Sequence, residues 1–166
     1  MLTHFTAVDI KSIPERWVAA WSSNDIENWV GLYTADGTYI DHAFQIRRSG
    51  RQVLARHHKI WRTANPDFVM TVVPNSPIWW SSDTNEETGN GSCSFRTINR
   101  GTNKANLPTH KATGKRFEFR GVIDMVIEGG LIKEMNEWYS QTPFDQTKPM
   151  EQFHSLSDED LRKGSL

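Results

Sequence analysis

The sequence predicts an α+β fold in which a strongly curved antiparallel or mixed sheet is covered by N-terminal helices, forming a cone with a pocket inside. Helical periodicity is concentrated early in the chain, over residues 13–33 and 50–64, and strand-like runs dominate after it. The two longest strand-like runs, 116–127 and 131–140, flank the turn Glu128–Gly130. Glycines at such a short connection allow the positive φ angles that a tight hairpin needs.

The first helical region, residues 13–33, divides into two helices. Ser12 is placed as an N-cap and Pro14 lies at an early helical position, so the first helix begins here. Ser22–Asp25 interrupts the pattern, and a second short helix follows. The apolar stripes consist of Ile13, Trp17, Ala20 and Trp21 in the first helix, and of Ile26, Trp29, Val30 and Tyr33 in the second.

A turn at Ala35–Gly37 leads into a short strand, Thr38–His42. A third helix over residues 50–64 presents an apolar side, consisting of Val53, Leu54, His57, Ile60 and Trp61. The remaining strands are predicted over residues 68–73, 78–81, 92–98, 116–127 and 131–140.

The 166 residues fit one domain, 1–142, followed by a polar tail, 143–166, with a short helix near residues 157–161. We expect loop 83–91 to project into solvent. Loop 99–114 is long and polar, and loops of that length often bind ligands or act as lids.

Composition excludes several classes of protein. The 19 Lys and Arg residues nearly balance 20 Asp and Glu residues, so we expect no nucleic-acid partner. No apolar run approaches the roughly 18 residues of a membrane span, and Met1–Thr6 shows no secretory signal, so we expect a cytoplasmic protein without a membrane partner. A single cysteine, Cys93, excludes an internal disulfide. The seven tryptophans and eight phenylalanines favour a ligand pocket or an interface, although core filling is the simpler explanation for any one ring.

Tyr39 and Asp41 lie on one face of their predicted strand, because side chains alternate with period two. If that face is inside the cone, Tyr39 can donate a hydrogen bond while Asp41 acts as a base. The alternative is that Asp41 ends the strand and accepts bonds from amides of the next loop.

Glu137 shares a face with Met135 and Tyr139 on the last strand. Apolar surroundings destabilise a carboxylate and raise its pKa toward neutrality, which suits a general acid or base. The alternative is a salt bridge on a solvated face, for which the available cations are Arg96, Arg120 and Lys133.

Other titratable residues are weaker candidates. Asp124 lies within an apolar run and is either a third pocket acid or an interface residue. His57 on the third helix and His110 in the long loop either contact a ligand or have structural roles. No His/Asp/Glu spacing indicates a metal site and no glycine-rich phosphate loop follows a strand, so we expect no metal and no nucleotide cofactor.

Several phrases of the chain resemble the nuclear transport factor 2-like (NTF2-like) superfamily, and in particular SnoaL-like polyketide cyclases. They are Trp17-Val-Ala-Ala-Trp21, Leu32-Tyr-Thr-Ala-Asp-Gly-Thr-Tyr-Ile-Asp41, Ala112-Thr-Gly-Lys115 and Phe119-Arg-Gly-Val followed by Glu-Gly-Gly-Leu-Ile-Lys-Glu-Met-Asn-Glu-Trp-Tyr139. The resemblance covers roughly residues 13–140 and implies a cone-shaped fold. That fold hosts isomerases, dehydratases, cyclases, epoxide hydrolases and binding domains, so fold alone does not give function.

The resemblance also implies where the chemistry lies. Tyr39-Ile-Asp41 and Glu137-Trp-Tyr139 are similar to the paired positions of limonene epoxide hydrolase-like members, with Asp41 in place of an amide. Arg96 resembles the arginine of their central strand, although the acid that follows it there is absent. Asp124 lies close to the acid of SnoaL cyclases, in a register that places that acid nearer Ile123.

The hypothesis is therefore a cofactor-independent acid–base enzyme for an apolar, oxygenated small molecule such as a polyketide or terpenoid intermediate. The reaction is ring closure, isomerisation or hydrolysis, with Asp41 and Glu137 as the acid and base. The predicted ligand-contacting residues are Trp17, Trp21, His57, Trp61, Arg96, His110, Phe119 and Met135. The alternative is a non-catalytic ligand-binding or dimerisation domain, and the resemblance implies a homodimer through the outer sheet face.

Overall fold

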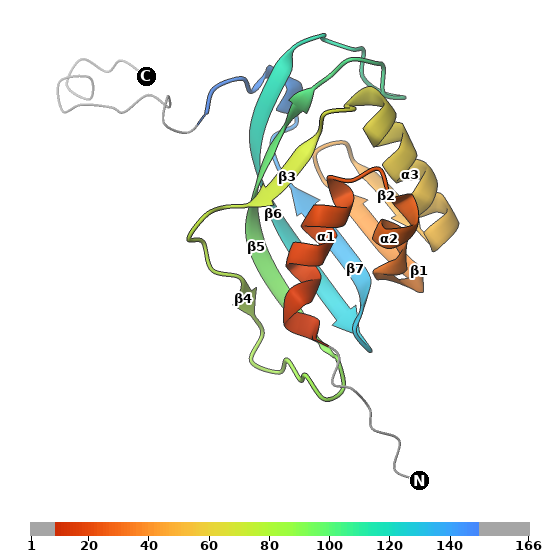
Figure 1. Cartoon of the computed structure of the whole chain (residues 1–166), viewed down its shortest axis with the longest axis vertical. Helices are drawn as coiled ribbons and strands as arrows, with labels where there is room; N and C mark the ends of the chain where they lie inside the picture. Colours follow the sequence, from red (N-terminus) through yellow and green to blue (C-terminus); the bar gives the residue numbers. More distant parts are fainter. Residues whose placement is uncertain (1–8, 150–166) are drawn as a thin grey trace, which may run out of the picture.

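The computed structural model describes residues 9–149, and within them three α-helices pack against one face of a curved mixed sheet (Figure 1). The predicted α+β cone is thereby confirmed. The α-helices are α1 (Ile13–Trp21), α2 (Ile26–Gly31) and α3 (Arg51–Ala64), and two 3₁₀ helices are η1 (Ile10–Ser12) and η2 (Pro143–Asp145). The strands are β1 (Tyr33–Asp41), β2 (Ile46–Ser49), β3 (Val69–Val72), β4 (Trp79–Trp80), β5 (Gly91–Thr102), β6 (Arg116–Glu128) and β7 (Leu131–Trp138).

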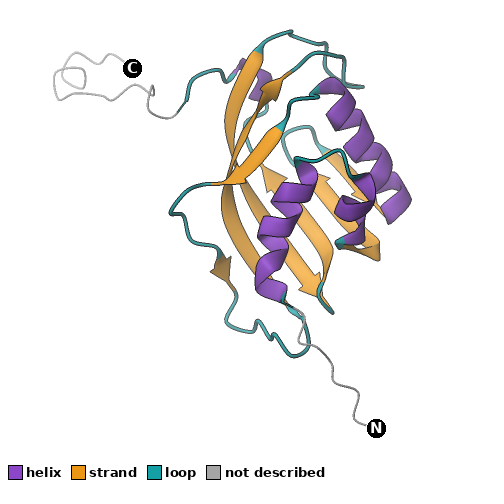
Figure 2. Ribbon diagram, in the orientation of Figure 1, coloured by secondary structure: helices purple, strands orange, loops and turns teal. Residues whose placement is uncertain are grey.

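The sheet runs in the order β2-β1-β7-β6-β5-β3, and β4 pairs with β5 beside this path. Every pairing is antiparallel except that of β1 with β7, which is parallel. Strands β5, β6 and β7 form the long curved wall seen behind the helices in Figure 2. The sheet therefore brings the early strand β1 beside the last strand, β7.

The hairpin between β6 and β7 turns as the sequence predicts. Gly129 and Gly130 have φ angles of 56° and 77°, in the left-handed region that favours glycine. The strands pair from Glu128 opposite Leu131 to Val122 opposite Trp138, with one register irregularity near Ile127.

Several predicted elements of the sheet differ from the structure, and the turn predicted at Ala35–Gly37 lies within β1. Tyr33 does not continue the second helix but begins β1, where its backbone oxygen accepts bonds from Arg51. Strand β2 was not predicted, because Ile46 is its one apolar residue and the strand lies at the sheet edge. Strand β5 extends to Thr102, which shortens the long polar loop that follows it.

Strand β1 is irregular at Gly37. The pairing with β7 shifts register between Tyr33 and Thr38, as at a β-bulge. A Cβ on Gly37 would lie 2.9 Å from the backbone oxygen of Ile132 and 3.0 Å from the Cβ of Tyr33. Glycine therefore lets β1 pass close to β7 before Tyr39 and Asp41 turn inward.

Aromatic side chains fill the space between the helices and the sheet. Trp21 is central, with ring centroids 4.6 Å from Trp29 and 5.6 Å from His57. Trp17 lies deeper, and its Nε1 donates to the Tyr33 hydroxyl over 2.8 Å. Such rings bury large apolar areas with few rotors, which gives the interior rigid walls.

The segment after β7 folds back onto the domain. Phe144 of η2 is buried, with its ring 5.2 Å from that of Phe117, and Glu118 N–H donates to Gln146 O over 2.7 Å. The helix predicted near residues 157–161 lies outside the described residues. None of the helices in residues 9–149 is long and apolar enough to cross a membrane.

We predict that Gly37→Ala lowers the free energy of unfolding by about 1–3 kcal/mol, because the added methyl group meets backbone atoms that cannot move freely. Urea denaturation measures the change. Gly31→Ala is the matched control, since nothing lies within 4 Å of its Cβ position. Equal stability of the two variants would contradict the close approach at Gly37.

Candidate active site

The parallel pairing of β1 with β7 places two acids side by side. Asp41 is the cross-strand partner of Glu137, and Tyr39 is the partner of Met135. Neighbouring strands lie about 4.8 Å apart, and partners in register point to the same face. Both carboxylates are buried, with 2% of Asp41 and 3% of Glu137 exposed. The salt bridge considered for Glu137 on a solvated face does not form, since the side chain lies inside.

A tyrosine hydroxyl from the opposite strand or its end donates to each acid. Tyr39 Oη donates to Glu137 Oε2 over 2.5 Å, and Tyr139 Oη donates to Asp41 Oδ2 over 2.5 Å. Asp41 Oδ1 also accepts from the Phe44 backbone N–H over 2.9 Å. Asp41 thus accepts a hydrogen bond from an amide of the following loop, which is the structural role considered for it, and it also lies beside Glu137.

Burial and, as a smaller cause, the neighbouring Asp41 charge together raise the pKa of Glu137 to about 8, while the Tyr39 hydrogen bond opposes the shift. Burial also raises the pKa of Asp41, against the Phe44 N–H and the Tyr139 hydroxyl, which both favour its charged form. Asp41 accepts two such bonds and Glu137 accepts one. The arrangement therefore favours a proton on Glu137 and a charge on Asp41 at neutral pH.

His57 lies against this cluster. Its ring centroid is 4.6 Å from that of Tyr39, and the ring stacks on Trp21 at an interplanar angle of 13°. Burial, with the nearby Arg48 charge, lowers the pKa of His57 to about 3. The imidazole is therefore neutral at physiological pH, and its Nε2 has no hydrogen-bond partner among the described residues.

Apolar side chains complete the inner wall. Phe119 stacks on Tyr139 with centroids 4.7 Å apart, and Met135 is fully buried beside the acids. Trp61 stacks on Phe144, closer to the mouth of the cone. Trp17 is a core residue whose contacts lie with the helices and Tyr33.

A cavity of about 60 Å³ opens at the mouth of the cone. Its lining residues are Phe44, Ile46, Arg48, His57, Ile60, Trp61, Leu107, Pro108 and Thr109. His110 is next to this mouth, where its ring meets Phe44 edge-on with centroids 4.5 Å apart. The long loop therefore reaches the mouth, and a contact between His110 and a ligand stays a prediction.

Arg96 and Asp124 lie on the other face of the sheet. Strands β5 and β6 alternate so that Phe95 and Ile123 point inward, and this turns Arg96 and Asp124 outward. The Arg96 guanidinium lies 5.1 Å from the Trp79 ring centroid. The expectation that Arg96 contacts a ligand inside the cone is wrong. Of the two roles considered for Asp124, that of a third pocket acid does not fit its outward position, and that of an interface residue stays a prediction.

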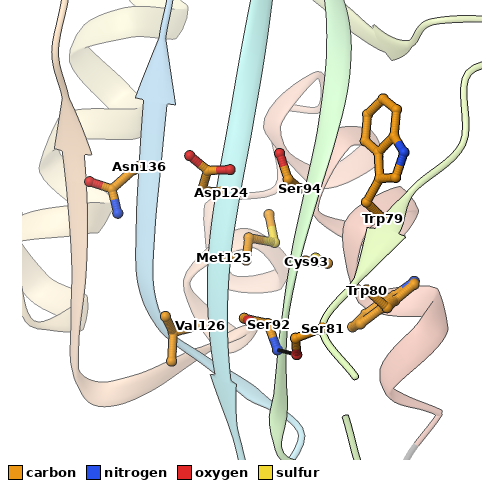
Figure 3. A pocket seen from close by; sticks show the side chains of 10 residues that line it. All are labelled: Trp79, Trp80, Ser81, Ser92, Cys93, Ser94, Asp124, Met125, Val126 and Asn136. Carbon is orange, nitrogen blue, oxygen red and sulfur yellow. Dashed lines mark hydrogen bonds between the residues drawn. The ribbon is translucent and has the colours of Figure 1, made fainter. Parts of the chain in front are cut away.

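Asp124 instead belongs to an outer cavity of about 310 Å³ between β4 and β7 (Figure 3). Its Oδ2 accepts from Trp138 Nε1 over 3.1 Å. Val122, Val126 and Trp138 are exposed on the same face. The homodimer that the resemblance implies would use this face and stays a prediction.

Three inner polar residues were not predicted as site residues. Tyr139 was noted only as an apolar neighbour of Glu137, yet it bonds Asp41. Thr97 and Asn99 point inward and are fully buried; Asn99 Nδ2 donates to Thr97 Oγ1 over 3.0 Å, and Asn99 Oδ1 has no partner among the described residues. Alternation from Phe95 along β5 was the signal that would have found them.

Within residues 9–149, no group of three or more His, Cys, Asp or Glu side chains comes together as metal ligands would. Cys93 is buried, and burial raises its pKa to about 12.

Most of the chain matches a known protein family. A family model described as SnoaL-like domain matches residues 15–135. A search among curated proteins finds no match.

Several solved structures share the fold. One, from Catenulispora acidiphila, has a ketosteroid isomerase-like fold and contains trimethylamine; it is 19% identical, covers 86% of this chain and 97% of its own, and has a TM-score of 0.66. A proposed SnoaL-like polyketide cyclase from Jannaschia sp. is 11% identical over 84% of this chain and 93% of its own, with a TM-score of 0.66. IdmH, a proposed polyketide cyclase from Streptomyces antibioticus, is 17% identical over 82% of this chain and 95% of its own, with a TM-score of 0.63.

We predict a stability change with pH that depends on Glu137. Between its ordinary pKa of 4.5 and about 8, the folded chain keeps this proton and the unfolded chain releases it. Stability therefore falls as pH rises through this window, by up to about 1.4 kcal/mol per pH unit. Glu137→Gln lacks this contribution. The unfolding free energy of wild type minus that of the variant should therefore decrease as pH rises.

Urea unfolding at intervals across that window measures the difference. Glu134→Gln, which removes an acid from the outer side of the same strand, controls for the loss of one carboxyl group. A wild-type-minus-Glu137→Gln difference that stays constant over the window would contradict the raised pKa.

Proposed function

Because this chain belongs to the SnoaL-like domain family, we propose that it is a cofactor-independent acid–base enzyme, a cyclase or isomerase of an apolar, oxygenated small molecule. The observation that carries the proposal is the buried pair of Asp41 and Glu137 on adjacent strands. Burying two acids costs stability, so such a pair needs a compensating role. Two carboxyl groups with separated pKa values provide an acid and a base at one pH.

In the proposed reaction Asp41 is the base. Its carboxylate removes a proton from a carbon next to a substrate carbonyl, and the electron pair of that C–H bond forms a carbon–carbon double bond. The carbonyl π pair takes the proton that Glu137 donates, which leaves an enol, a protonated Asp41 and an ionised Glu137. At this point Asp41 carries a proton and Glu137 is ionised, the reverse of the starting state.

The enol has two outcomes. In an isomerisation of a β,γ-unsaturated substrate the enol is a dienol. Asp41 returns its proton to the γ carbon, the double bond shifts to the α,β position, and Glu137 recovers the proton from oxygen as the carbonyl group re-forms. In a cyclisation, the enol carbon attacks a second carbonyl carbon, whose oxygen takes the proton from Asp41 while Glu137 recovers the enol proton. Both outcomes restore the starting protonation of the pair.

Tyr39 and Tyr139 act as positioning residues in this proposal. Each donates to one carboxyl group and fixes its orientation, and the Tyr139 bond also favours the charged form of Asp41. His57, Trp21, Phe119 and Met135 form walls that exclude water, which strengthens electrostatic interactions with the acids.

Two further observations support the substrate class. The walls around the acids are aromatic, which suits an apolar body with ring or conjugated portions. The similar solved structures include proteins proposed as polyketide cyclases. The mouth cavity has a volume of about 60 Å³ and neither acid lines it, so in this proposal side chains between the cavity and the acids move when the ligand binds.

We predict that Asp41→Asn and Glu137→Gln each lower turnover by roughly 10²–10⁴-fold, the usual contribution of a general acid or base. Metabolite extracts incubated with each protein and analysed by mass spectrometry identify a compound that wild type consumes or isomerises. Glu134→Gln is the control, since its acid lies outside the cone. A compound that is retained through gel filtration yet never altered by wild type would favour the non-catalytic binding domain instead.

The pH profile of kcat/KM should fall on the alkaline side near pH 8, where Glu137 loses its proton. Tyr39→Phe removes a hydrogen bond that lowers this pKa, so the alkaline limb should move to higher pH. Tyr33→Phe, which removes a hydroxyl bonded to Trp17, is the control. An alkaline limb that moves to lower pH in Tyr39→Phe would contradict the assignment of Glu137 as the acid.

A further inference from the structure

Arg48 lies on the inner side of the sheet at the mouth of the cone. It is the cross-strand partner of Tyr39, so its side chain leaves β2 on the face that Tyr39 occupies. Arg47, the next residue, is exposed and leaves on the outer face. The edge strand thus directs one cation toward the interior.

The Arg48 guanidinium has no acidic partner among the described residues. Its Nη1 donates to Arg47 O over 3.0 Å, and the remaining donors of the five that arginine carries are free of protein partners there. The ion pairs of the described chain join other residues, namely Arg100–Glu118, Arg120–Glu118 and Lys133–Asp36. A partly exposed guanidinium without a counter-ion leaves donors available to an anionic ligand.

His57 supplies an independent observation at the same place. It lines the mouth cavity with Arg48, only 8% of it is exposed, and its Nε2 has no protein partner. A buried ring nitrogen left unpaired costs roughly 1–3 kcal/mol, so a ligand atom that bonds it is favoured. The neutral ring donates when the proton is on Nε2, and an oxygen anion selects that tautomer.

The cavity suits a small charged group. Its volume of about 60 Å³ holds several waters, since one water needs roughly 10–15 Å³ of cavity space. Ile46, Ile60 and Leu107 make much of the remaining wall apolar, as in sites where a few polar groups fix a ligand.

The approach to the cavity is also basic. A groove of about 630 Å³ shares Ile60, Leu107 and Pro108 with the cavity and carries Arg56 and Lys59. No acid is among the described residues that line it. Cations along a groove raise the local concentration of an anionic ligand.

We infer that the mouth cavity is a subsite for an oxyanion group, a carboxylate or phosphate, carried by an otherwise apolar ligand, and that Arg48 and His57 bind it. The position of the apolar part of the ligand beside Asp41 and Glu137 rests on the proposed function. With its anion at the mouth, the ligand extends past Tyr39 toward the acids, and Arg48 fixes which carbon reaches Asp41.

Calorimetry of the full chain with 2-naphthoate and the neutral 2-naphthamide tests the subsite. Wild type should bind the acid at least about tenfold more tightly, and the preference should weaken with salt. Arg48→Gln should abolish the preference, whereas Arg47→Gln on the outer face of the same strand should keep it. Arg48→Lys, which retains the charge without the planar fork, should keep part of it.

Equal binding of each anion and its neutral analogue by wild type (2-naphthoate with 2-naphthamide, and phenyl phosphate with phenol), or an undiminished preference in correctly folded Arg48→Gln, would overturn the subsite. Neither result touches the acid–base proposal, because the probes need no turnover. Asp41→Asn should keep the acid preference, which separates loss of the subsite from loss of the chemistry. Phenyl phosphate against phenol then distinguishes a phosphate from a carboxylate preference, and selective binding of either anion supports the subsite.

Discussion

The parallel contact between β1 and β7 is the interaction on which the rest of the molecule depends. It joins the first strand to the last, and it alone sets Asp41 beside Glu137. Two acids in an aromatic interior are unfavourable unless their lone pairs are satisfied, and the hydroxyls of Tyr39 and Tyr139 meet that need from across the junction. The same contact therefore joins β1 and β2 to the long wall of β5, β6 and β7 and brings the two acids together.

The fold, and the strand faces of four candidate site residues, could be predicted from the sequence for a clear physical reason. Alternation along one strand depends on local sequence alone, so Tyr39 with Asp41, and Glu137 with Tyr139, were assigned to common faces. Arg96 was wrongly assigned to the inner face, because the assignment came from a resemblance and not from the alternation with Phe95. A shift of one residue along a strand moves a side chain to the opposite face of the sheet.

Other features depend on which strands are neighbours, and one strand's pattern does not contain that information. The bond from Tyr139 to Asp41 requires the parallel β1–β7 pairing, and the inward direction of Arg48 requires a β2 that local sequence hardly marks. The unpaired nitrogen of His57 could be recognised only after the surrounding rings were placed. The least predictable residues are thus those that lie between elements.

The reciprocal arrangement of the tyrosines has a consequence for how this site can diverge. Each strand contributes an acid, and the hydroxyl that serves that acid comes from the neighbouring strand or the residue just after it. Loss of one acid leaves a buried hydroxyl without its acceptor, and loss of one hydroxyl leaves a buried charge less well solvated. Substitutions at these four positions should therefore be epistatic, with tolerated changes arising in cross-strand pairs. During divergence of this sequence, an acid and the tyrosine that donates to it should be substituted together, whereas the surrounding aromatic residues can be substituted independently.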